Sequence, residues 1–394
     1  MTGRTVFLSY VFPPDEMPRA IQVGRLVRHS HLEDLHVVCA TERPDGPNTH
    51  TVPWGASARL RRNLRWKTIR SRHLVPDAFR PWARDAARAA WALKPRTVVT
   101  FGQPMSDHLA GLQLKRRTGV RWIAHFSDPW VANPFRTDGR LAHGANLRLE
   151  SAVLRRADAL VFTSEETVDV VLSGPRAGLR AKAHVLPHAI EPGAYPDLPV
   201  RSDGDPLVVR HLGAFYGART PAPLLRALGA LAEGEPGMLA DVRVELWGSS
   251  ELPVQETAEF CALPPGVVTV GGVVPYARSL ELMRSADLLV VVDAPAELSV
   301  FLPSKLIDYL GARRPLLALT PPGTASSLVR AAGGHVARPD DPRACADALR
   351  AALALARSNR GHYWGDPDVL ARYDAVVIAS RMDELVRSVT GRDP

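Results

Sequence analysis

Residues 301–319, FLPSKLIDYLGARRPLLAL, contain a short helix between a loop and an apolar strand. Pro303 ends the preceding loop, and Ser304 is a residue type that favours the N-cap of a helix. Apolar residues then repeat at helical spacing to about Gly311, and an apolar run typical of a buried strand follows. The stretch therefore predicts part of a strand–helix–strand unit in which loop 293–303 leads into a helix N-terminus.

Lys305 lies in the first turn of this helix, where the helix dipole disfavours a cation. A bound anion would remove that penalty, and phosphate is a common ligand at helix N-termini. Asp308 follows one turn later on the same face, where a carboxylate could bind sugar hydroxyls as it binds ribose in dinucleotide sites. The alternative is a surface Lys305–Asp308 ion pair that contributes about a few tenths of a kcal/mol.

The length of 394 residues favours two domains. Cys39, Cys261 and Cys345 lie far apart without metal-binding spacing, which fits a reduced compartment and no disulfide framework. The longest clean apolar run, 288–292, is far too short to cross a bilayer. Because the N-terminus also lacks a signal-peptide pattern, we expect a cytoplasmic protein.

Basic residues concentrate in one segment of the chain. Between Arg59 and Arg96 there are 12 basic and two acidic residues, a local charge of +10, whereas the whole chain carries +8. Trp and Phe residues interleave with these charges. Such a segment could contact anionic lipids, a nucleic acid or an anionic acceptor, or it could be a solvated helical face. Nucleic-acid-binding signatures are absent, so we expect no nucleic acid as partner and peripheral contact of 54–96 with the inner face of an anionic membrane.

Apolar strand-like runs alternate with helical patterns, which predicts parallel sheets built from βαβ units. A Pro-, Gly- and Asp-rich linker at 191–206 separates two such series. We expect an α/β protein with two Rossmann-like doubly wound domains facing across a cleft, the first at 1–195 and the second at 196–365. The last helix, expected at 369–389 within segment 366–394, could pack back across the domain seam.

Ligands of doubly wound sheets bind outside the carboxyl ends of the strands. In the first series this edge would carry residues 13–19, 102–106 and 127–133. His125 and Asp128 are close to it, and either could act as a general base or stabilise positive charge on a sugar. The alternatives are a satisfied core histidine and an aspartate that forms a turn or caps a helix.

The second series contains GAFYGAR at 213–219, directly after an expected strand. Gly213 and Gly217 would let the backbone approach a ligand, and Arg219 could bind a phosphate in bidentate fashion. The alternative is an ordinary tight turn. The dinucleotide fingerprint, the Walker A motif, the zincin and zinc-ribbon motifs and the nucleophile elbow are all absent, so no metal site is expected.

Six different motifs follow one another along the chain. They are SYVFPP (9–14), FGQPMSDHLAGLQLKRRTGVRWIAHFSDPW (101–130), FTSEE (162–166), LPHAIEP (186–192), HLGAFYGAR (211–219) and LPSKLIDYLGARRPLLAL (302–319). Together they resemble the retaining glycosyltransferases of family 4, which have the GT-B fold, over nearly the whole chain. The resemblance implies transfer of a sugar from a nucleoside diphosphate sugar, as co-substrate, to an acceptor, with no metal and no cofactor.

The resemblance also implies where the donor binds. In such enzymes the C-terminal domain holds the nucleotide, and Arg219 and Lys305 would neutralise its diphosphate. Asp308 falls where the family usually has a glutamate that binds the ribose hydroxyls. The expected donor-binding residues are Gly213, Arg219, Glu297, Ser304, Lys305 and Asp308.

The N-terminal domain would hold the acceptor, which could be a glycan, a lipid-linked sugar or a small natural product. Asp128 or His125 would lie near the reacting carbon of the sugar and, with Arg219 and Lys305, form the expected catalytic set. The expected acceptor-binding residues are Pro14, Arg19, Gln103 and Ser106.

The chain departs from the family pattern at two places. The usual pair of glutamates eight residues apart is missing, because Val300 stands at the first position and Glu297 is out of register. Relatives commonly have DFRDPW where this chain has His125 and Ser127. These departures leave open a nucleotide-sugar epimerase of the same fold, or a non-catalytic protein that binds a sugar or a partner enzyme.

Overall fold

The computed structural model describes residues 3–53, 75–199, 202 and 204–391. The chain divides into two compact units. Unit 1 comprises Met1–Ala189 and Ala375–Pro394, and unit 2 comprises Ile190–Asp374. Residues 54–74 of the basic segment lie outside the described residues, so the expectation of membrane contact there concerns, within the described chain, only 75–96. Among the described residues, no helix is both long enough and apolar enough to cross a membrane.

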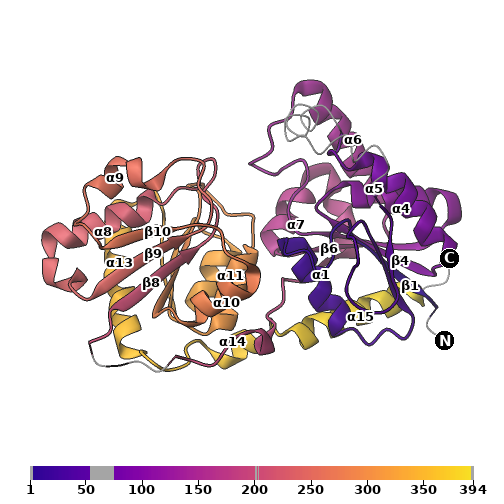
Figure 1. Ribbon diagram of the computed structural model, residues 1–394. Coiled ribbons are helices and arrows are strands. Elements are labelled where there is room, and N and C mark those ends of the chain that lie inside the picture. The colour runs from indigo at the N-terminus through magenta and orange to yellow at the C-terminus, as the bar shows by residue number, and fades with distance from the viewer. Residues whose placement is uncertain (1–2, 54–74, 200–201, 203, 392–394) are drawn as a thin grey trace. The chain divides into compact units, whose positions relative to one another are not determined.

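Unit 1 is built around a parallel sheet of seven strands in the order β3-β2-β1-β4-β5-β6-β7 (Figure 1). The strands are β1 (Thr5–Leu8), β2 (Leu35–Cys39), β3 (Thr49–Thr51), β4 (Thr97–Gly102), β5 (Arg121–Phe126), β6 (Ala159–Phe162) and β7 (Ala183–Val185). Most of them are apolar runs because helices cover both faces of the sheet. The strand order reverses between β1 and β4, which places a topological switch point there.

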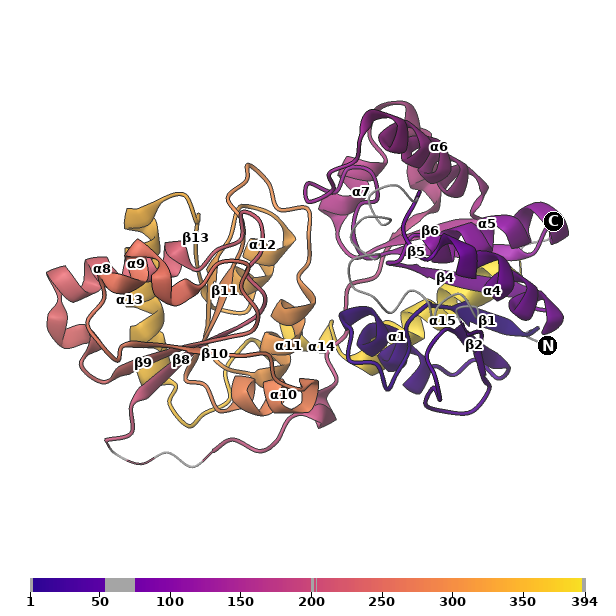
Figure 2. The ribbon, with the colours of Figure 1, turned by 45° about the horizontal axis from the view of Figure 1, so that its top comes forward.

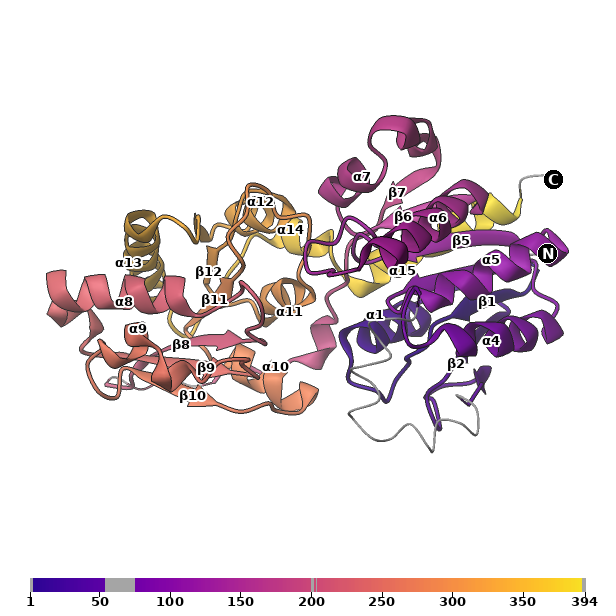
Figure 3. The ribbon, with the colours of Figure 1, turned by 90° about the horizontal axis from the view of Figure 1, so that it is seen from above.

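Helices cover the two faces of this sheet unequally. On one face lie α4 (Arg80–Ala92), α5 (Ser106–Thr118), α6 (Arg140–Arg156) and α7 (Glu165–Val171), and on the other lie α1 (Pro18–Arg28) and α15 (Ala375–Thr390). A 3₁₀ helix, η1 (Gly174–Lys182), precedes β7. Figures 2 and 3 show α4 and α5 side by side and α6 beyond α5.

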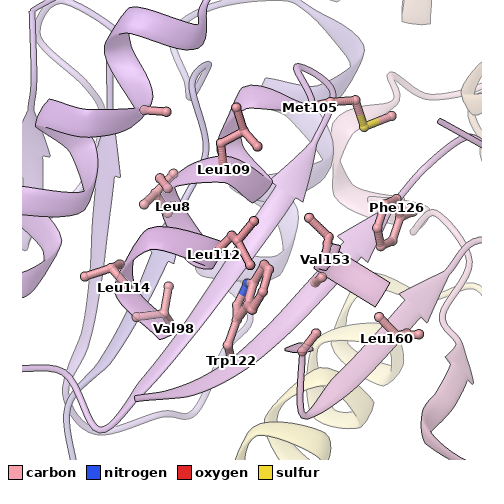
Figure 4. Packing of buried hydrophobic residues seen from close by; sticks show 14 of the residues in the cluster. Leu8, Val98, Met105, Leu109, Leu112, Leu114, Trp122, Phe126, Val153 and Leu160 are labelled. Atoms are coloured by element: carbon pink, nitrogen blue, oxygen red, sulfur yellow. The ribbon is translucent and has the colours of Figure 1, made fainter. Parts of the chain in front are cut away.

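The alternation of β5 shows how the sequence determines these two faces. Trp122 points to the α4–α7 face, where it packs near Leu112 (Figure 4), and Ile123 points to the α1/α15 face. The indole N–H of Trp122 donates to the Thr100 hydroxyl at 2.9 Å, which satisfies the one polar atom of a fully buried ring.

Unit 2 contains a parallel sheet of six strands in the order β10-β9-β8-β11-β12-β13. The strands are β8 (Leu207–Leu212), β9 (Val242–Trp247), β10 (Val268–Gly271), β11 (Leu288–Val292), β12 (Leu316–Leu319) and β13 (His335–Ala337). The order reverses between β8 and β11, which gives unit 2 its own switch point. The predicted fold class of two doubly wound α/β domains is confirmed.

The helices of unit 2 also form two layers. One face of the sheet is covered by α8 (Ala222–Gly234) and α13 (Pro342–Ser358), and the other by α10 (Tyr276–Arg284), α11 (Ser304–Ala312) and α12 (Thr324–Ala331). The shorter elements are η2 (Pro192–Ala194), η3 (Pro236–Leu239), η4 (Val254–Glu256), α9 (Ala258–Cys261) and α14 (Pro367–Ala371).

The end of the chain differs from its predicted form. The single helix expected at 369–389 is two helices, α14 and α15, which are separated by residues 372–374. At this break the backbone N–H of Ile190 donates to the Tyr373 carbonyl at 2.6 Å. This bond lies within unit 2 and joins the segment at which the chain enters unit 2 to the segment at which it leaves. The apolar face of α15 contributes to the core of unit 1, together with α1.

Two smaller expectations also differ. The first domain was expected to end at 195, whereas the division of contacts falls after Ala189. Ser304 was expected to cap α11, but Pro303 is the N-cap, with no side-chain hydrogen bond, and Ser304 is the first helical residue. The helix therefore begins one residue earlier than predicted, because proline, which lacks an N–H to lose, fits the position where the helix starts.

Candidate functional site

In unit 2 the loops after β8 and β9 are joined where the strands end. The backbone N–H of Gly213 donates to the Trp247 carbonyl at 2.8 Å, and that of Phe215 to the Ser249 carbonyl at 2.9 Å. Gly248 has φ of 133°, and a Cβ there would lie 2.1 Å from the Gly213 carbonyl oxygen. The two turns are therefore packed backbone against backbone, which only glycine permits at position 248.

Gly213 is required for a reason the sequence did not reveal. A Cβ at this position would lie 2.9 Å from Nε2 of His211 and 3.4 Å from Cδ of Lys305. The glycine thus lets an imidazole from β8 and a lysine stem from α11 approach the same turn. This contact brings the two predicted donor residues, Gly213 and Lys305, together at the switch point.

His211 is buried beneath this turn. Its Nδ1 bonds to the Val290 carbonyl at 2.9 Å, so Nδ1 carries the proton, and Nε2 is left as an acceptor without a partner among the described residues. Burial lowers the pKa of His211 to about 3, against the opposing effect of the bond to Val290, and the charges of Lys305 and Arg219 lower it further. Because the charges of Lys305 and Arg219 both affect the pKa of His211, the two cations lie near the same imidazole.

Arg219 is held by a carboxylate that the sequence analysis did not identify. Its Nε and Nη2 donate to Oδ1 of Asp293 at 3.1 and 2.7 Å, and Nη1 donates to the Tyr216 hydroxyl at 2.8 Å. Asp293 directly follows β11, is 4% exposed, and also accepts bonds from Ser299 and from the backbone N–H of Ala294. The ion pair thus spans the switch point between β8 and β11.

Lys305 differs from Arg219 in having no such partner. Its ammonium makes no hydrogen bond or ion pair with any residue in the described part of the chain. Although the residue as a whole is exposed, desolvation lowers the pKa of the amine, and the charge of Asp308 opposes this shift. A cation that has lost part of its water without gaining a counter-ion is suited to bind an anion.

The other predicted donor residues are placed less favourably. Asp308 is buried in α11, and its Oδ1 accepts from the Tyr276 hydroxyl at 3.1 Å. Ser304 is half-buried in the first turn of α11, and Glu297 is exposed in loop 293–303. A pocket of 400 Å³ opens beside Arg219, lined by the β8–α8 loop and residues of 250–259.

In unit 1 the predicted residues meet at the carboxyl ends of β4 and β5. Gln103 follows β4 and donates to Oδ2 of Asp128 at 3.0 Å. Arg19, buried in α1, donates through Nη2 to the Gly102 carbonyl. Burial lowers the pKa of Arg19 to about 10, and the charges of Asp128 and Asp107 oppose the shift. Arg19, Gln103 and Asp128 therefore form one polar group at this edge.

The histidines of this edge are uncharged. His125 is 4% exposed, and its Nδ1 has no partner within the described ranges of the chain. Burial together with the charge of Arg19 lowers its pKa well below the ordinary value. The pKa of His108 and that of His188 are both lowered to about 3, again chiefly by burial. His125 is therefore a weak base and serves better as a hydrogen-bond partner, whereas half-buried Asp128 remains the better candidate for contact with a developing positive charge.

Ser106 and Pro14 are placed differently from each other. Ser106 is fully buried, and both its hydroxyl and its backbone N–H donate to the carboxylate of Asp77, at 2.5 and 3.0 Å. Its side chain thus anchors the start of α5. Pro14 is exposed in the connection between β1 and α1.

A pocket of 440 Å³ lies at the same edge of unit 1, next to Gln103. Tyr10 lines it and contacts the Phe79 ring, with 4.2 Å between the ring centroids. Burial raises the pKa of Tyr10 to about 12, with smaller contributions from Asp107, Asp15 and Asp77. Further lining residues include Asp77, Trp130, Asn133 and Arg136.

Sequence reasoning missed His211, Asp293 and Tyr10. His211 and Tyr10 lie inside quoted motifs, so their position directly after or at the end of a strand was an available signal. Asp293 was not singled out, although a charged residue at the end of the apolar run 288–292 is itself such a signal. No group of His, Cys, Asp and Glu side chains that could hold a metal ion occurs among the residues that the structure describes.

Comparison with solved structures shows the fold of the whole chain. Sucrose-phosphate synthase from Thermosynechococcus elongatus is 16% identical with a TM-score of 0.67, over 98% of this chain and 99% of that one. HepE from Anabaena, in complex with UDP, is 14% identical with a TM-score of 0.64, over 98% and 100%. A glycosyltransferase from Rickettsia africae is 10% identical with a TM-score of 0.65, over 100% of both chains.

Sequence comparison locates the family signal in unit 1. No curated protein is similar enough in sequence to match. Residues 20–189 match the model of the glycosyl transferase 4-like domain. This match covers less than half of the chain, and the two α/β units of the chain have the GT-B fold.

Proposed function

We propose that the protein is a glycosyltransferase that moves a sugar from a nucleoside diphosphate sugar to an acceptor. The observation that carries the proposal is the group of Gly213, Lys305 and Arg219 around the neutral His211 at the switch point of unit 2. It offers two cations, a close backbone approach and the N-terminus of the nine-residue helix α11. Diphosphates bind to this combination of groups.

The chemistry that this arrangement supports is stabilisation of a leaving group. When the bond between the sugar and the diphosphate breaks, negative charge grows on the diphosphate oxygens. Lys305 and Arg219 would stabilise that charge where a divalent cation does so in other enzymes, and we include metal independence in the proposal for this reason. Asp308 lies one turn after Lys305 and would bind the ribose hydroxyls.

Unit 1 would hold the acceptor at its own switch point. The pocket of 440 Å³ beside Gln103 has aromatic walls and polar groups at its rim, a composition typical of small-molecule sites. Asp128, oriented by Gln103, would face the reacting carbon and stabilise its positive charge. The acceptor would be a glycan, a lipid-linked sugar or a small natural product.

Known ligands of similar folds support this assignment. HepE from Anabaena has been solved with UDP, with UDP and glucose, and with UDP-glucose. We extend the same class of donor to this chain, and with it retention of configuration, which rests on the family resemblance.

One observation favours a non-catalytic alternative. Arg219 is already paired with Asp293, and Asp308 already accepts a bond from Tyr276, so two of the proposed donor contacts are occupied by the protein itself. A protein that only binds a sugar or nucleotide would tolerate these pairs. An epimerase of the same fold would use the same donor site without an acceptor.

A thermal-shift screen followed by product analysis tests the proposal. UDP, GDP, dTDP and their sugars are added singly, and a true ligand raises the melting temperature by mass action. We expect one nucleoside diphosphate series to stabilise the protein, and incubation with that donor sugar to release the free nucleoside diphosphate. An isomerised donor without an acceptor would identify an epimerase. Stabilisation without turnover would identify a binding protein, and no stabilisation by any of them would contradict the proposal.

A further inference from the structure

The outer face of helices α4, α5 and α6 carries an unusual excess of positive charge. Nine arginines of these helices are exposed, and Asp85 is the one exposed acidic residue in them. The two other acidic residues, Asp107 and Glu150, are buried. The nine arginines are Arg80, Arg84, Arg88, Arg116, Arg117, Arg140, Arg148, Arg155 and Arg156.

Several surface arginines of unit 2 are paired with carboxylates. In unit 2, Arg226, Arg278 and Arg350 pair with Glu259, Glu281 and Glu235 respectively, at 3.0, 2.6 and 2.7 Å. On the α4–α6 face the described residues provide one such pair, Arg88 with Asp85 at 3.4 Å. Like charges left unbalanced on one surface repel one another, and an anionic partner would remove that cost.

A groove lies within this charged face. It has a volume of 620 Å³ between α4, α5 and α6, and three arginines, Arg80, Arg84 and Arg116, line it with one carboxylate, that of Asp85. Leu109 and Leu112, which also line it, are 6% and 3% exposed and form an apolar floor. A cationic rim above an apolar floor suits a molecule with an anionic head and an apolar body.

Large apolar side chains project from the same three helices. Leu141 and Leu147 of α6 are 92% and 38% exposed, and Trp91 of α4 is 48% exposed. Exposed leucines add nothing to contacts with nucleic-acid phosphates. At an anionic lipid surface, by contrast, burial of the leucines and attraction of the arginines both favour binding. Tryptophan is likewise favoured at the level of lipid head groups.

We propose that the outer face of α4, α5 and α6 binds the surface of an anionic phospholipid bilayer. The arginines contact lipid phosphates, the groove receives a head group, and Leu141 and Leu147 enter the boundary between head groups and acyl chains. The contact is peripheral, weakens with salt, and rests on no part of the proposed transfer reaction.

Co-sedimentation with vesicles tests this proposal on the full chain. The vesicles are made of equal parts of phosphatidylglycerol and phosphatidylcholine, and neutral vesicles of phosphatidylcholine alone are run in parallel at low salt. We expect binding to the anionic vesicles, release at high salt and no binding to the neutral ones. Absence of binding to anionic vesicles, or equal binding to both kinds, would overturn the proposal.

Substitutions locate the contact. One exposed arginine near an anionic membrane changes the partition coefficient between membrane and water by about fivefold. The triple variant Arg84→Gln/Arg116→Gln/Arg148→Gln should therefore bind anionic vesicles about a hundredfold more weakly. The matched control Arg226→Gln/Arg278→Gln/Arg350→Gln removes the same charge from unit 2 and should change binding by less than about threefold. Equal losses in the two triple variants would contradict the assignment, and melting temperatures confirm that both remain folded.

A second pair of variants separates lipid from nucleic acid. Leu141→Ser should weaken vesicle binding several-fold, and Val273→Ser, which removes an apolar side chain that is 77% exposed in unit 2, should not. An RNA duplex bound more tightly than the vesicles, with Leu141→Ser as strong as the parent, would overturn the choice of partner. Lys305→Ala should bind vesicles like the parent, so this test and that of the transfer reaction fail independently.

Discussion

The switch points of the two units differ in how far their charged side chains are exposed. In unit 1, His125, His108 and Asp107 are 4%, 0% and 0% exposed, and each has a buried polar atom with no partner in the part of the chain that the structure describes. In unit 2, Lys305 is exposed, and the charge of Arg219 is met by Asp293 in an ion pair. Both edges therefore hold a neutral buried imidazole, since His211 of unit 2 is buried as well, and they differ in their cations: Lys305 of unit 2 is exposed, whereas Arg19 of unit 1 is buried.

This difference follows from desolvation and indicates that the two edges have different roles. The buried imidazoles of unit 1 stay neutral and offer hydrogen bonds and shape, and the charge of this edge is limited to Asp128 beside the buried Arg19. A group near water or beside a carboxylate keeps its charge, so the unit 2 edge offers electrostatic stabilisation. Acceptor positioning in unit 1 and charge stabilisation in unit 2 are the roles that these two environments suit.

The largest effect is expected for Lys305→Ala. Removal of the ammonium eliminates a cation that makes no hydrogen bond or ion pair with the described residues, and turnover of the donor should fall at least about a hundredfold. Release of the nucleoside diphosphate, measured by chromatography, reports the loss. Arg338→Ala, which removes an exposed arginine of unit 2, is the control and should keep full activity. If Lys305→Ala kept turnover within threefold of the parent, the role of the unit 2 edge in charge stabilisation would be contradicted.

The unit 1 edge is tested by the pH dependence of stability. Burial, with Arg19 and Arg25, lowers the folded-state pKa of His188 to about 3, below the ordinary value of 6.5. Between these values the unfolded chain binds a proton that the native protein does not, so stability falls as pH falls through this window. From pH 6.5 to about pH 4.5 the parent should lose about 2 kcal/mol more free energy of unfolding than His188→Gln does.

Urea unfolding at the two pH values measures this difference. His143→Gln changes an exposed histidine of α6 and should retain the pH dependence of the parent. If His188→Gln lost stability with pH as steeply as the parent, the histidine would not be held neutral by the fold.

Asp293→Asn should have a smaller, kinetic effect. The amide keeps an acceptor for the backbone N–H of Ala294 but loses the charge that fixes the guanidinium of Arg219. We expect kcat to fall about tenfold with a smaller change in the donor KM, because a misaligned cation stabilises the transition state less. Asp340→Asn, in an exposed pair with Arg338, should change neither constant. Unchanged kcat in Asp293→Asn would show that Arg219 needs no alignment.

The smallest effect is expected for Gln103→Ala. The amide donates to Asp128 at a rim position that is exposed, so its loss leaves no buried group unsatisfied. The acceptor KM should rise about two- to fivefold, with the donor KM unchanged. Gln255→Ala in unit 2 is the control. If only the donor KM changed, Gln103 would contact the donor and not the acceptor, which would contradict its assignment.

Much of the fold could be predicted from local pattern. Parallel strands covered on both faces appear as short apolar runs, so both sheets were recognisable, and so was the loop that leads into α11. Gly213, Arg219 and Lys305 were predicted from strand ends and one helix start. Those signals are local, and the structure brings all three residues to the same edge.

The missed features depend on neighbours distant in sequence. Asp293 and Arg219 meet because β11 lies beside β8 in the sheet, and His211 is explained by the glycine it packs against and by Lys305. No local pattern indicates either contact. The break between α14 and α15 was hidden because residues 372–374 contain neither glycine nor proline.

Calorimetric titration with nucleoside diphosphates tests the central claim most directly. UDP, GDP and dTDP are titrated into the parent protein, into Arg219→Gln/Lys305→Ala and into the matched control Arg278→Gln/Arg338→Ala. The account predicts that one of the three nucleotides binds the parent and the control alike, and binds Arg219→Gln/Lys305→Ala at least about a hundredfold more weakly. Equal binding to all three folded proteins would contradict the placement of the diphosphate in unit 2.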